Sequence, residues 1–263
     1  MSGSKLFTIC LSLGIFLLTA CDHIAEGDEL IHVKQEPAQR VVLLEDFTGQ
    51  RCVNCPLGSE VIEQLQEAYG DNVVAVGIHG GPLGFKGNAK NVGLATDLGD
   101  EYYNHWNLEY QPVGLINRHG AVNYTDWAKV VKEELTKKSS IDLKASAALK
   151  DGSIDIAVEV IGKDGTVNGK LQVWVLEDGI MAMQKMPQEM GGGSKSDYVH
   201  NHVLRTAVNG TWGDGFSINE GETKQQTYTQ PVDAKWNTAN LSIVAFVYND
   251  NGVEQAVKTK VRR

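Results

Sequence analysis

Apolar residues are grouped in two different ways along the chain, and the change falls near residue 140. Before it, near-continuous apolar runs at residues 41–47 and 73–78 are typical of strands buried on both faces of a parallel sheet. Between these runs, apolar residues recur with helical spacing, and Gly70 follows as a helix-ending residue. The pattern therefore predicts a strand, a helix and a second strand in one βαβ unit.

The next stretch, residues 79–111, has the character of an insertion, in which we predict loops and one helix over about residues 96–106. The dipeptide Gln111-Pro112 then leads into a short strand, and a turn at residues 117–120 leads to a short return strand. A last helix is predicted over residues 125–138, where one face is apolar and the end is rich in lysine.

Beyond residue 140, apolar and polar residues alternate with period two, and Asp-Gly and Asn-Gly pairs mark the turns. About six to eight strands in so short a stretch predict an antiparallel, immunoglobulin-like β-sandwich over residues 141–263. It follows an α/β domain at residues 41–140. The polar, acidic residues 21–40 ahead of that domain are interpreted as a tether.

The first twenty residues have the pattern of a secretory signal, with Lys5 ahead of an apolar run that is too short to span a membrane. The run ends in Leu18-Thr19-Ala20-Cys21, which resembles the lipobox of bacterial lipoproteins. We therefore expect cleavage before Cys21 and acylation of that cysteine. The alternative is an ordinary signal peptide with a chance cysteine, which would leave the match at all four positions unexplained.

Charge narrows the possible partners. The chain of 263 residues has a net charge of −9, and removal of the signal takes away only Lys5, which makes it −10. Such a balance argues against nucleic-acid binding and against adhesion to anionic lipid. The expected membrane attachment is the lipid on Cys21 itself.

Two of the four cysteines remain as thiols once Cys10 is removed and Cys21 is acylated. These are Cys52 and Cys55, which lie between the first predicted strand and its helix. Outside the cytoplasm such a pair readily forms a disulfide. The unpaired N–H groups at a helix start would favour the thiolate of Cys52, with Cys55 one turn further in.

The segments Asp46-Phe47, Arg51-Cys52-Val53-Asn54-Cys55 and Gln111-Pro112-Val113 resemble the thioredoxin family. The resemblance implies a thioredoxin-like domain at residues 41–140, with Asp46 beneath the cysteines and Pro112 as the cis-proline beside them. Cys52, nearer to solvent, would attack a substrate disulfide, Cys55 would resolve the mixed disulfide, and Asp46 would exchange protons with Cys55. Arg51 stands where the family usually has tryptophan, and its charge should favour the thiolate of Cys52.

Several alternatives stay open. The cysteines could form a static disulfide, and Glu45 rather than Asp46 could be the inward acid. A zinc site is disfavoured because no second cysteine pair or spaced histidine pair completes four ligands. Four methionines lie close together, at positions 181, 183, 186 and 190. Their soft thioether groups would suit Cu(I), but we favour the interpretation that they belong to a flexible apolar loop that packs on other parts of the protein or on a partner.

Taken whole, the chain resembles the Omp28-related outer membrane lipoproteins of Bacteroidetes. The resemblance rests on the lipobox, on the residues around Phe47-Thr48-Gly49 and Cys52, on the strand at residues 113–118, and on residues 198–205. It implies attachment to the outer membrane and allows exposure at the cell surface.

Two functions follow as expectations. The first is a thiol–disulfide oxidoreductase without a cofactor, acting on envelope or surface proteins that carry thiols or disulfides. The second is a non-catalytic surface binding lipoprotein of the adhesin or receptor type, in which the β-sandwich recognises the ligand. An exposed Cys52 beside Pro112 in an open groove would favour the first, and a covered cysteine pair would favour the second.

Overall fold

The computed structural model describes residues 36–263, so the predicted signal, Cys21 and most of the tether lie outside the described residues. The first elements alternate between strand and helix, as the apolar runs predict. Their bounds are β1 (Ala38–Gln39), β2 (Val42–Thr48), α1 (Cys55–Tyr69), β3 (Val73–His79), α2 (Asp97–His105), β4 (Val113–Ile116), β5 (Ala121–Asn123), α3 (Trp127–Glu134) and β6 (Lys138–Ser139).

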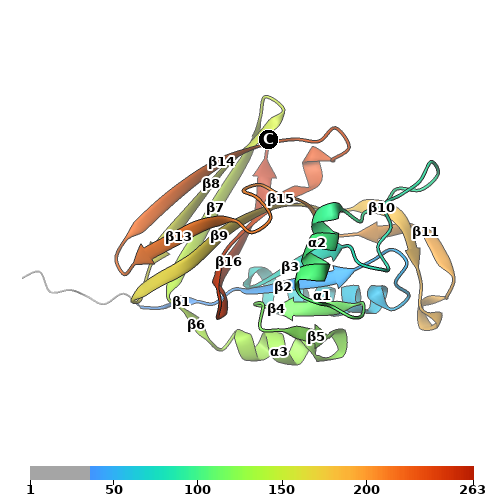
Figure 1. Ribbon diagram of the computed structural model, residues 1–263, viewed down its shortest axis with the longest axis horizontal. Coiled ribbons are helices and arrows are strands. Elements are labelled where there is room, and N and C mark those ends of the chain that lie inside the picture. Colours follow the sequence, from blue (N-terminus) through green and yellow to red (C-terminus); the bar gives the residue numbers. More distant parts are fainter. Residues whose placement is uncertain (1–35) are drawn as a thin grey trace, which may run out of the picture. The chain divides into compact units, whose positions relative to one another are not determined.

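Strands β2 and β3 are parallel and adjacent, and β4 pairs antiparallel with the other side of β2. Every residue of β2 and β3 is buried, because both faces of this part of the sheet are covered. Helices α1 and α3 pack on one face, around Ile62, Leu65 and Trp127, while α2 lies against the other (Figure 1). The continuous apolar runs reflect this two-sided burial.

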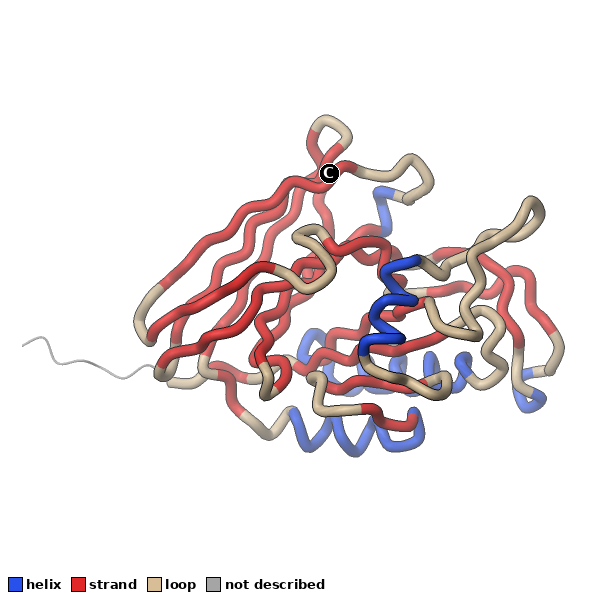
Figure 2. The backbone as a smooth tube through the Cα atoms, in the orientation of Figure 1, coloured by secondary structure: helices blue, strands red, loops and turns tan. Residues whose placement is uncertain are grey.

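The later part of the chain is almost entirely β-structure (Figure 2). Its strands are β7 (Ile141–Lys150), β8 (Ser153–Gly162), β9 (Thr166–Glu177), β10 (Ile180–Lys185), β11 (Ser194–His200), β12 (Val203–Ala207), β13 (Asp214–Asn219), β14 (Thr223–Pro231), β15 (Leu241–Asn249) and β16 (Gly252–Arg262).

Alternate side chains of these strands meet in one apolar cluster that includes Ile156, Val173 and Ile243. Two layers enclose it, and β16 belongs to both, since it pairs with β15 along most of its length and with β7 at its end. The pairing of β16 with β7 is parallel, which corrects the prediction of a purely antiparallel sandwich. The period-two pattern cannot distinguish the two directions, because it records only which face is buried.

A single sheet of 12 strands runs through both parts of the chain, in the order β14-β8-β7-β16-β15-β9-β12-β3-β2-β4-β5, with β13 also paired to β9. The junction is made by β12, which is parallel to β3 at Val203 and Gly77 and antiparallel to β9 on its other side. The fold is thus a mixed α/β fold with mostly β content. No helix in residues 36–263 is both long enough and apolar enough to span a bilayer.

Three further segments differ from the sequence-based expectations. The methionine-rich stretch is not a flexible loop, because β10 and β11 form an antiparallel hairpin that contains it. The last helix of the α/β part is shorter than predicted and covers only Trp127–Glu134. At the other end of this part, Ala38 and Gln39 already pair with β6, so the end of the predicted tether belongs to the fold.

Candidate functional site

The two cysteines lie in the turn between β2 and α1. They form a disulfide with an S–S distance of 2.14 Å. The helix begins at Cys55, with Asn54 at the N-cap and Pro56 in the first turn, so Cys52 precedes the helix and does not start it. Proline favours this boundary because it has no N–H to lose in the first turn of a helix. The expectation that the helix start acts directly on Cys52 is therefore wrong for this structure.

Both cysteines are buried, with only 1% of Cys52 and 2% of Cys55 exposed to solvent. The peptide bond between Gln111 and Pro112 is cis, and Pro112 is also buried. A loop of the 79–111 region covers the turn, since Arg51 donates its backbone N–H to Leu83 O at 3.0 Å. The exposed Cys52 in an open groove that exchange chemistry needs is therefore absent from this conformation of residues 36–263.

The hairpin of β10 and β11 also closes over the cysteine turn (Figure 1). The buried Gln184 on β10 donates its side-chain amide to Cys52 O at 2.7 Å and to Gly49 O at 3.3 Å. The Lys185 N–H donates to Gln50 O at 2.9 Å. Gln50 itself, fully buried, donates to Met183 O at 3.0 Å and accepts from the Leu94 N–H at 2.8 Å. These contacts bind the hairpin, the turn and the 79–111 loop to one another.

Glu45 and Asp46, the two candidate acids on β2, have opposite environments. Glu45 forms a bidentate ion pair with Arg118, at 2.9 Å from Oε1 to Nη2 and 3.0 Å from Oε2 to Nε. Asp46 is 3% exposed and lines a cavity together with Cys55. Its Oδ1 has no hydrogen-bond partner within the described residues, and burial raises the pKa of Asp46 from its usual 3.8 to about 8. Asp46 is thus the acid beside the disulfide, as its spacing to Cys52 predicts.

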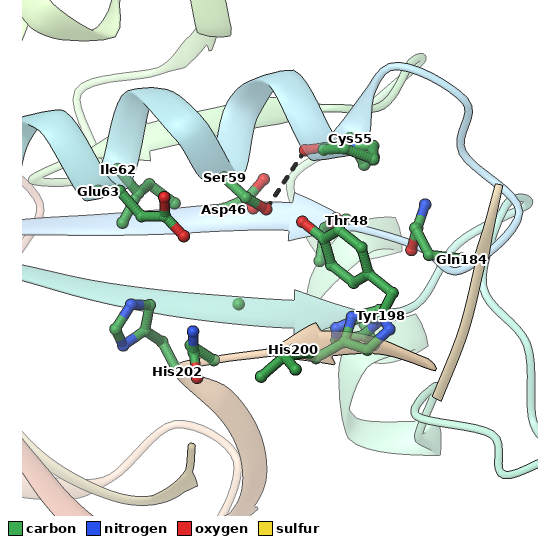
Figure 3. Close-up of a pocket in the computed structure, with 15 residues that line it drawn as sticks. Asp46, Thr48, Cys55, Ser59, Ile62, Glu63, Gln184, Tyr198, His200 and His202 are labelled. Atoms are coloured by element: carbon green, nitrogen blue, oxygen red, sulfur yellow. Dashed lines mark hydrogen bonds between the residues drawn. The ribbon is translucent and has the colours of Figure 1, made fainter. Parts of the chain in front are cut away.

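This cavity is small and polar, with about 40 Å³ open to the centres of water molecules. On that measure one water needs ~10–15 Å³, so about three waters fit. Figure 3 shows Cys55, Ser59 and Glu63 of α1 on one side of it and Tyr198 and His200 of β11 on the other.

Two histidines add to this buried polar environment, His79 from β3 and His200 from β11, with ring centroids 5.3 Å apart. Burial lowers the pKa of His200 to about 4 and that of His79 well below its usual 6.5. The three buried titratable groups beside the disulfide, Asp46, His79 and His200, are therefore all in their neutral forms at neutral pH.

The chain is similar to known proteins in sequence and in structure. A family model described as outer membrane protein Omp28 matches residues 99–263, which is more than half of the chain. The chain belongs to the Omp28 family. This membership supports a location at the outer membrane.

Solved structures with a similar fold were also found. HBP35 of Porphyromonas gingivalis superposes with a TM-score of 0.65 at 16% identity, covering 85% of this chain and 76% of that one. A protein from Agrobacterium tumefaciens gives 0.51 at 15% identity, over 85% and 95% of the two chains. A domain of the lipoprotein Omp28 from P. gingivalis is 29% identical over 47% of this chain and 89% of that domain, with a TM-score of 0.35. No curated protein matches.

The Omp28 match begins downstream of Cys52 and Cys55, so family membership alone carries no thiol chemistry to this chain. The remaining predicted site residue, Arg51, stacks its guanidinium on the Phe85 ring at 4.9 Å. Within the described residues, no group of three or more His, Cys, Asp or Glu side chains could hold a metal ion. Met181 is 69% exposed on β10, whereas Met186 is buried.

Sequence reasoning missed the residues that close the site, namely Gln50, Gln184 and the two histidines. His200 falls in a segment that the Omp28 resemblance highlights, but nothing in its spacing points to the cysteines. Gln184 lies on the same face of β10 as the buried Ala182, and a glutamine at such a position is the one signal that could have pointed to a buried hydrogen-bond network.

Proposed function

We propose that this Omp28-family protein is a binding lipoprotein of the outer membrane, in which a thioredoxin-like domain retains Cys52–Cys55 as a structural disulfide. One observation carries the proposal: both sulfur-bearing residues are buried beneath a hairpin that is hydrogen-bonded to their own turn. Thiol–disulfide exchange needs direct approach of a substrate sulfur to Cys52, and this conformation leaves no path for it.

The thioredoxin-like assignment is supported by the order of the parts. A buried parallel strand leads through the cysteine turn into α1, a parallel strand follows, and Pro112 in cis opens β4. Gly58 of α1 lies close to Pro112, because a Cβ added at Gly58 would come within 3.4 Å of the Pro112 Cβ. The beginning of α1, which directly follows the cysteine turn, and the proline are therefore neighbours in space.

The closed disulfide can be tested by its reactivity. We expect dithiothreitol followed by iodoacetamide to label Cys52 and Cys55 slowly in the native protein and rapidly in urea, as read by mass spectrometry. Gln184→Ala should label about thirtyfold faster, because the loss of its two hydrogen bonds to the cysteine turn, at ~1 kcal/mol each, makes opening of the hairpin easier.

A matched control is Gln172→Ala. Gln172 is a buried glutamine of β9 whose side chain donates hydrogen bonds to Asn209 and Gly210. Labelling of this variant should stay at the wild-type rate. Native labelling as fast as that in urea would contradict a closed disulfide.

Thiol–disulfide exchange on envelope or surface proteins is the second candidate function, and the buried Asp46 beside Cys55 is the observation that favours it. Starting from the disulfide of this structure, a substrate thiolate would attack Cys52 Sγ and displace the Cys55 thiolate. A second substrate thiolate would then displace Cys52 from the mixed disulfide, so that the substrate loses two electrons and the cysteine pair is reduced. The hairpin would have to move first. Mixed disulfides through Cys52 in a Cys55→Ser protein, trapped in the envelope, would establish this function.

Attachment through a lipid on Cys21 belongs to the same proposal and rests on the lipobox. Metabolic labelling with a fatty acid should mark the wild-type protein, and a Cys21→Ala variant should carry no label and leave the membrane fraction. Retention of the label in that variant would contradict lipidation at Cys21.

A further inference from the structure

A second and much larger cleft lies away from the disulfide, between the end of α2, strand β9 and the turn that joins β15 to β16. About 810 Å³ of it is open to water centres, a size typical of small-molecule sites. No residue of the cysteine site lines it. The residues that shape it are Trp106, Arg118, Asn168, Trp212, Tyr248 and Asp250.

Aromatic side chains form the walls of this cleft and are held in place by their neighbours. Trp212 stacks with His105 at 4.1 Å between ring centroids and packs edge-on against Tyr102 at 5.1 Å. The Tyr248 hydroxyl donates to Trp212 O at 2.7 Å. Rigid aromatic faces of this kind offer large contact area at little entropic cost on binding.

The floor is formed by Arg118, whose guanidinium lies 4.3 Å from the centroid of Tyr248 and is ion-paired with Glu45. Two buried N–H donors that border the cleft, Arg118 Nη1 and Trp106 Nε1, have no hydrogen-bond partner within the described residues. Unpaired buried donors are costly, and these two have almost no exposed surface. A small shift of the Arg118 or Trp106 side chain toward the cleft would bring such a donor to an acceptor oxygen of a ligand. A purely apolar ligand would leave them unpaired.

The charges around the cleft balance. Arg118 is neutralised by Glu45, and the exposed rim carries one cation, Lys170, and one anion, Asp250. A strongly charged ligand would find no excess charge of the opposite sign. The fitting ligand is therefore neutral and has both apolar faces and oxygen acceptors.

An extended peptide also has acceptor oxygens, but the strand that borders the cleft, β9, is already paired on both sides. At Lys170, strand β9 is bonded on one side to β13, at Gly215, and on the other to β15, at Tyr248. No free sheet edge is available there for an added strand. Recognition must come from side chains, which favours a ring-shaped ligand over a peptide.

We propose that this cleft binds a neutral saccharide, with the C–H face of a sugar ring on Trp212 and Tyr248 and its hydroxyl groups on Asn168 and Asp250 at the rim. The inference rests on the proposed binding function, for which it names the site and the class of ligand. Asn168 and Asp250 are exposed at the rim, where planar amide and carboxylate groups can each engage neighbouring hydroxyls.

Isothermal titration calorimetry of the full chain with maltohexaose, cellohexaose and chitohexaose tests the proposal. We expect at least one of the three to bind. Trp212→Ala should weaken that binding at least about tenfold, as removal of a central tryptophan usually does. Since Trp212 also packs on Tyr102, the variant Asn168→Ala at the exposed rim should independently weaken it about threefold or more.

Trp236→Ala is the matched control, because this half-buried tryptophan lies outside the cleft and stacks with Arg205. It should leave the affinity unchanged. Absence of binding by all three saccharides would overturn the proposal, and so would binding that Trp212→Ala and Asn168→Ala both leave intact. Binding of a peptide that none of the three saccharides displaces would overturn the ligand class.

The structural disulfide and the saccharide site can be tested independently of each other. A Cys52→Ser, Cys55→Ser protein that keeps its fold should bind the saccharide as the wild type does. Loss of binding in that variant, or rapid labelling of native Cys52, would count against a purely structural disulfide, whereas a silent calorimetric titration counts only against the saccharide.

Discussion

An Asp46→Asn variant is expected to be about as stable as the wild type near pH 4 and more stable by on the order of 5 kcal/mol above about pH 8. The reason is the buried position of Asp46, which raises the pKa of this carboxyl from 3.8 to about 8. Asparagine has nearly the same shape as the protonated acid but cannot ionise, so it keeps the neutral state at every pH.

The direction follows from proton binding. Between pH 3.8 and about 8, the folded wild type keeps the proton on Asp46 while the unfolded chain has lost it. Stability contributed by the protonated acid is complete below pH 3.8 and is lost as the pH rises through this window, by about 1.4 kcal/mol for each pH unit. The asparagine variant lacks this loss, so the two stability curves diverge toward high pH.

Urea unfolding followed by tryptophan fluorescence at a series of pH values measures the divergence. Glu63→Gln is the matched control, because Glu63 lines the same cavity from α1 but is exposed. Its stability should follow the wild-type curve. Parallel curves for wild type and Asp46→Asn would show that Asp46 ionises normally in the folded state.

The α/β part could be predicted because its signals are local. The runs at residues 41–47 and 73–78 became β2 and β3, and the cysteine pair fell in the turn between β2 and α1. The choice between Glu45 and Asp46 could only be made by spacing. Both acids are buried on opposite faces of β2, and neither the polarity nor the alternation of a strand buried on both sides distinguishes them.

The covering of the cysteine turn by the β10–β11 hairpin could not be predicted, because it depends on contacts between residues far apart in the chain. The hydrogen bonds from Gln184 to the cysteine turn join β10 to a loop more than a hundred residues earlier. A period-two pattern fixes which residues of β10 are buried but not what they are buried against. The same holds for the cleft, whose walls come from α2, β9 and β15.

Arg118→Met should destabilise the fold by about 3–5 kcal/mol, the usual effect of removing one member of a buried ion pair. Glu45 is 1% exposed, and without Arg118 its carboxylate would be left in the apolar layer between β2 and β15 with no counter-charge. Urea unfolding measures the change. A loss as small as that of a surface substitution would show that water or another cation reaches Glu45.

An exposed ion pair with the same separation serves as a control, because it isolates the effect of burial on stability. Lys144 and Glu159 also lie 2.9 Å apart from nitrogen to oxygen, but on an exposed face of β7 and β8, so Lys144→Met should change stability little. The double variant Glu45→Leu, Arg118→Met should recover most of the stability, since apolar residues can replace a buried pair. If it folds well and no longer binds the saccharide, the buried pair is retained for the floor of the cleft rather than for the stability of the sheet.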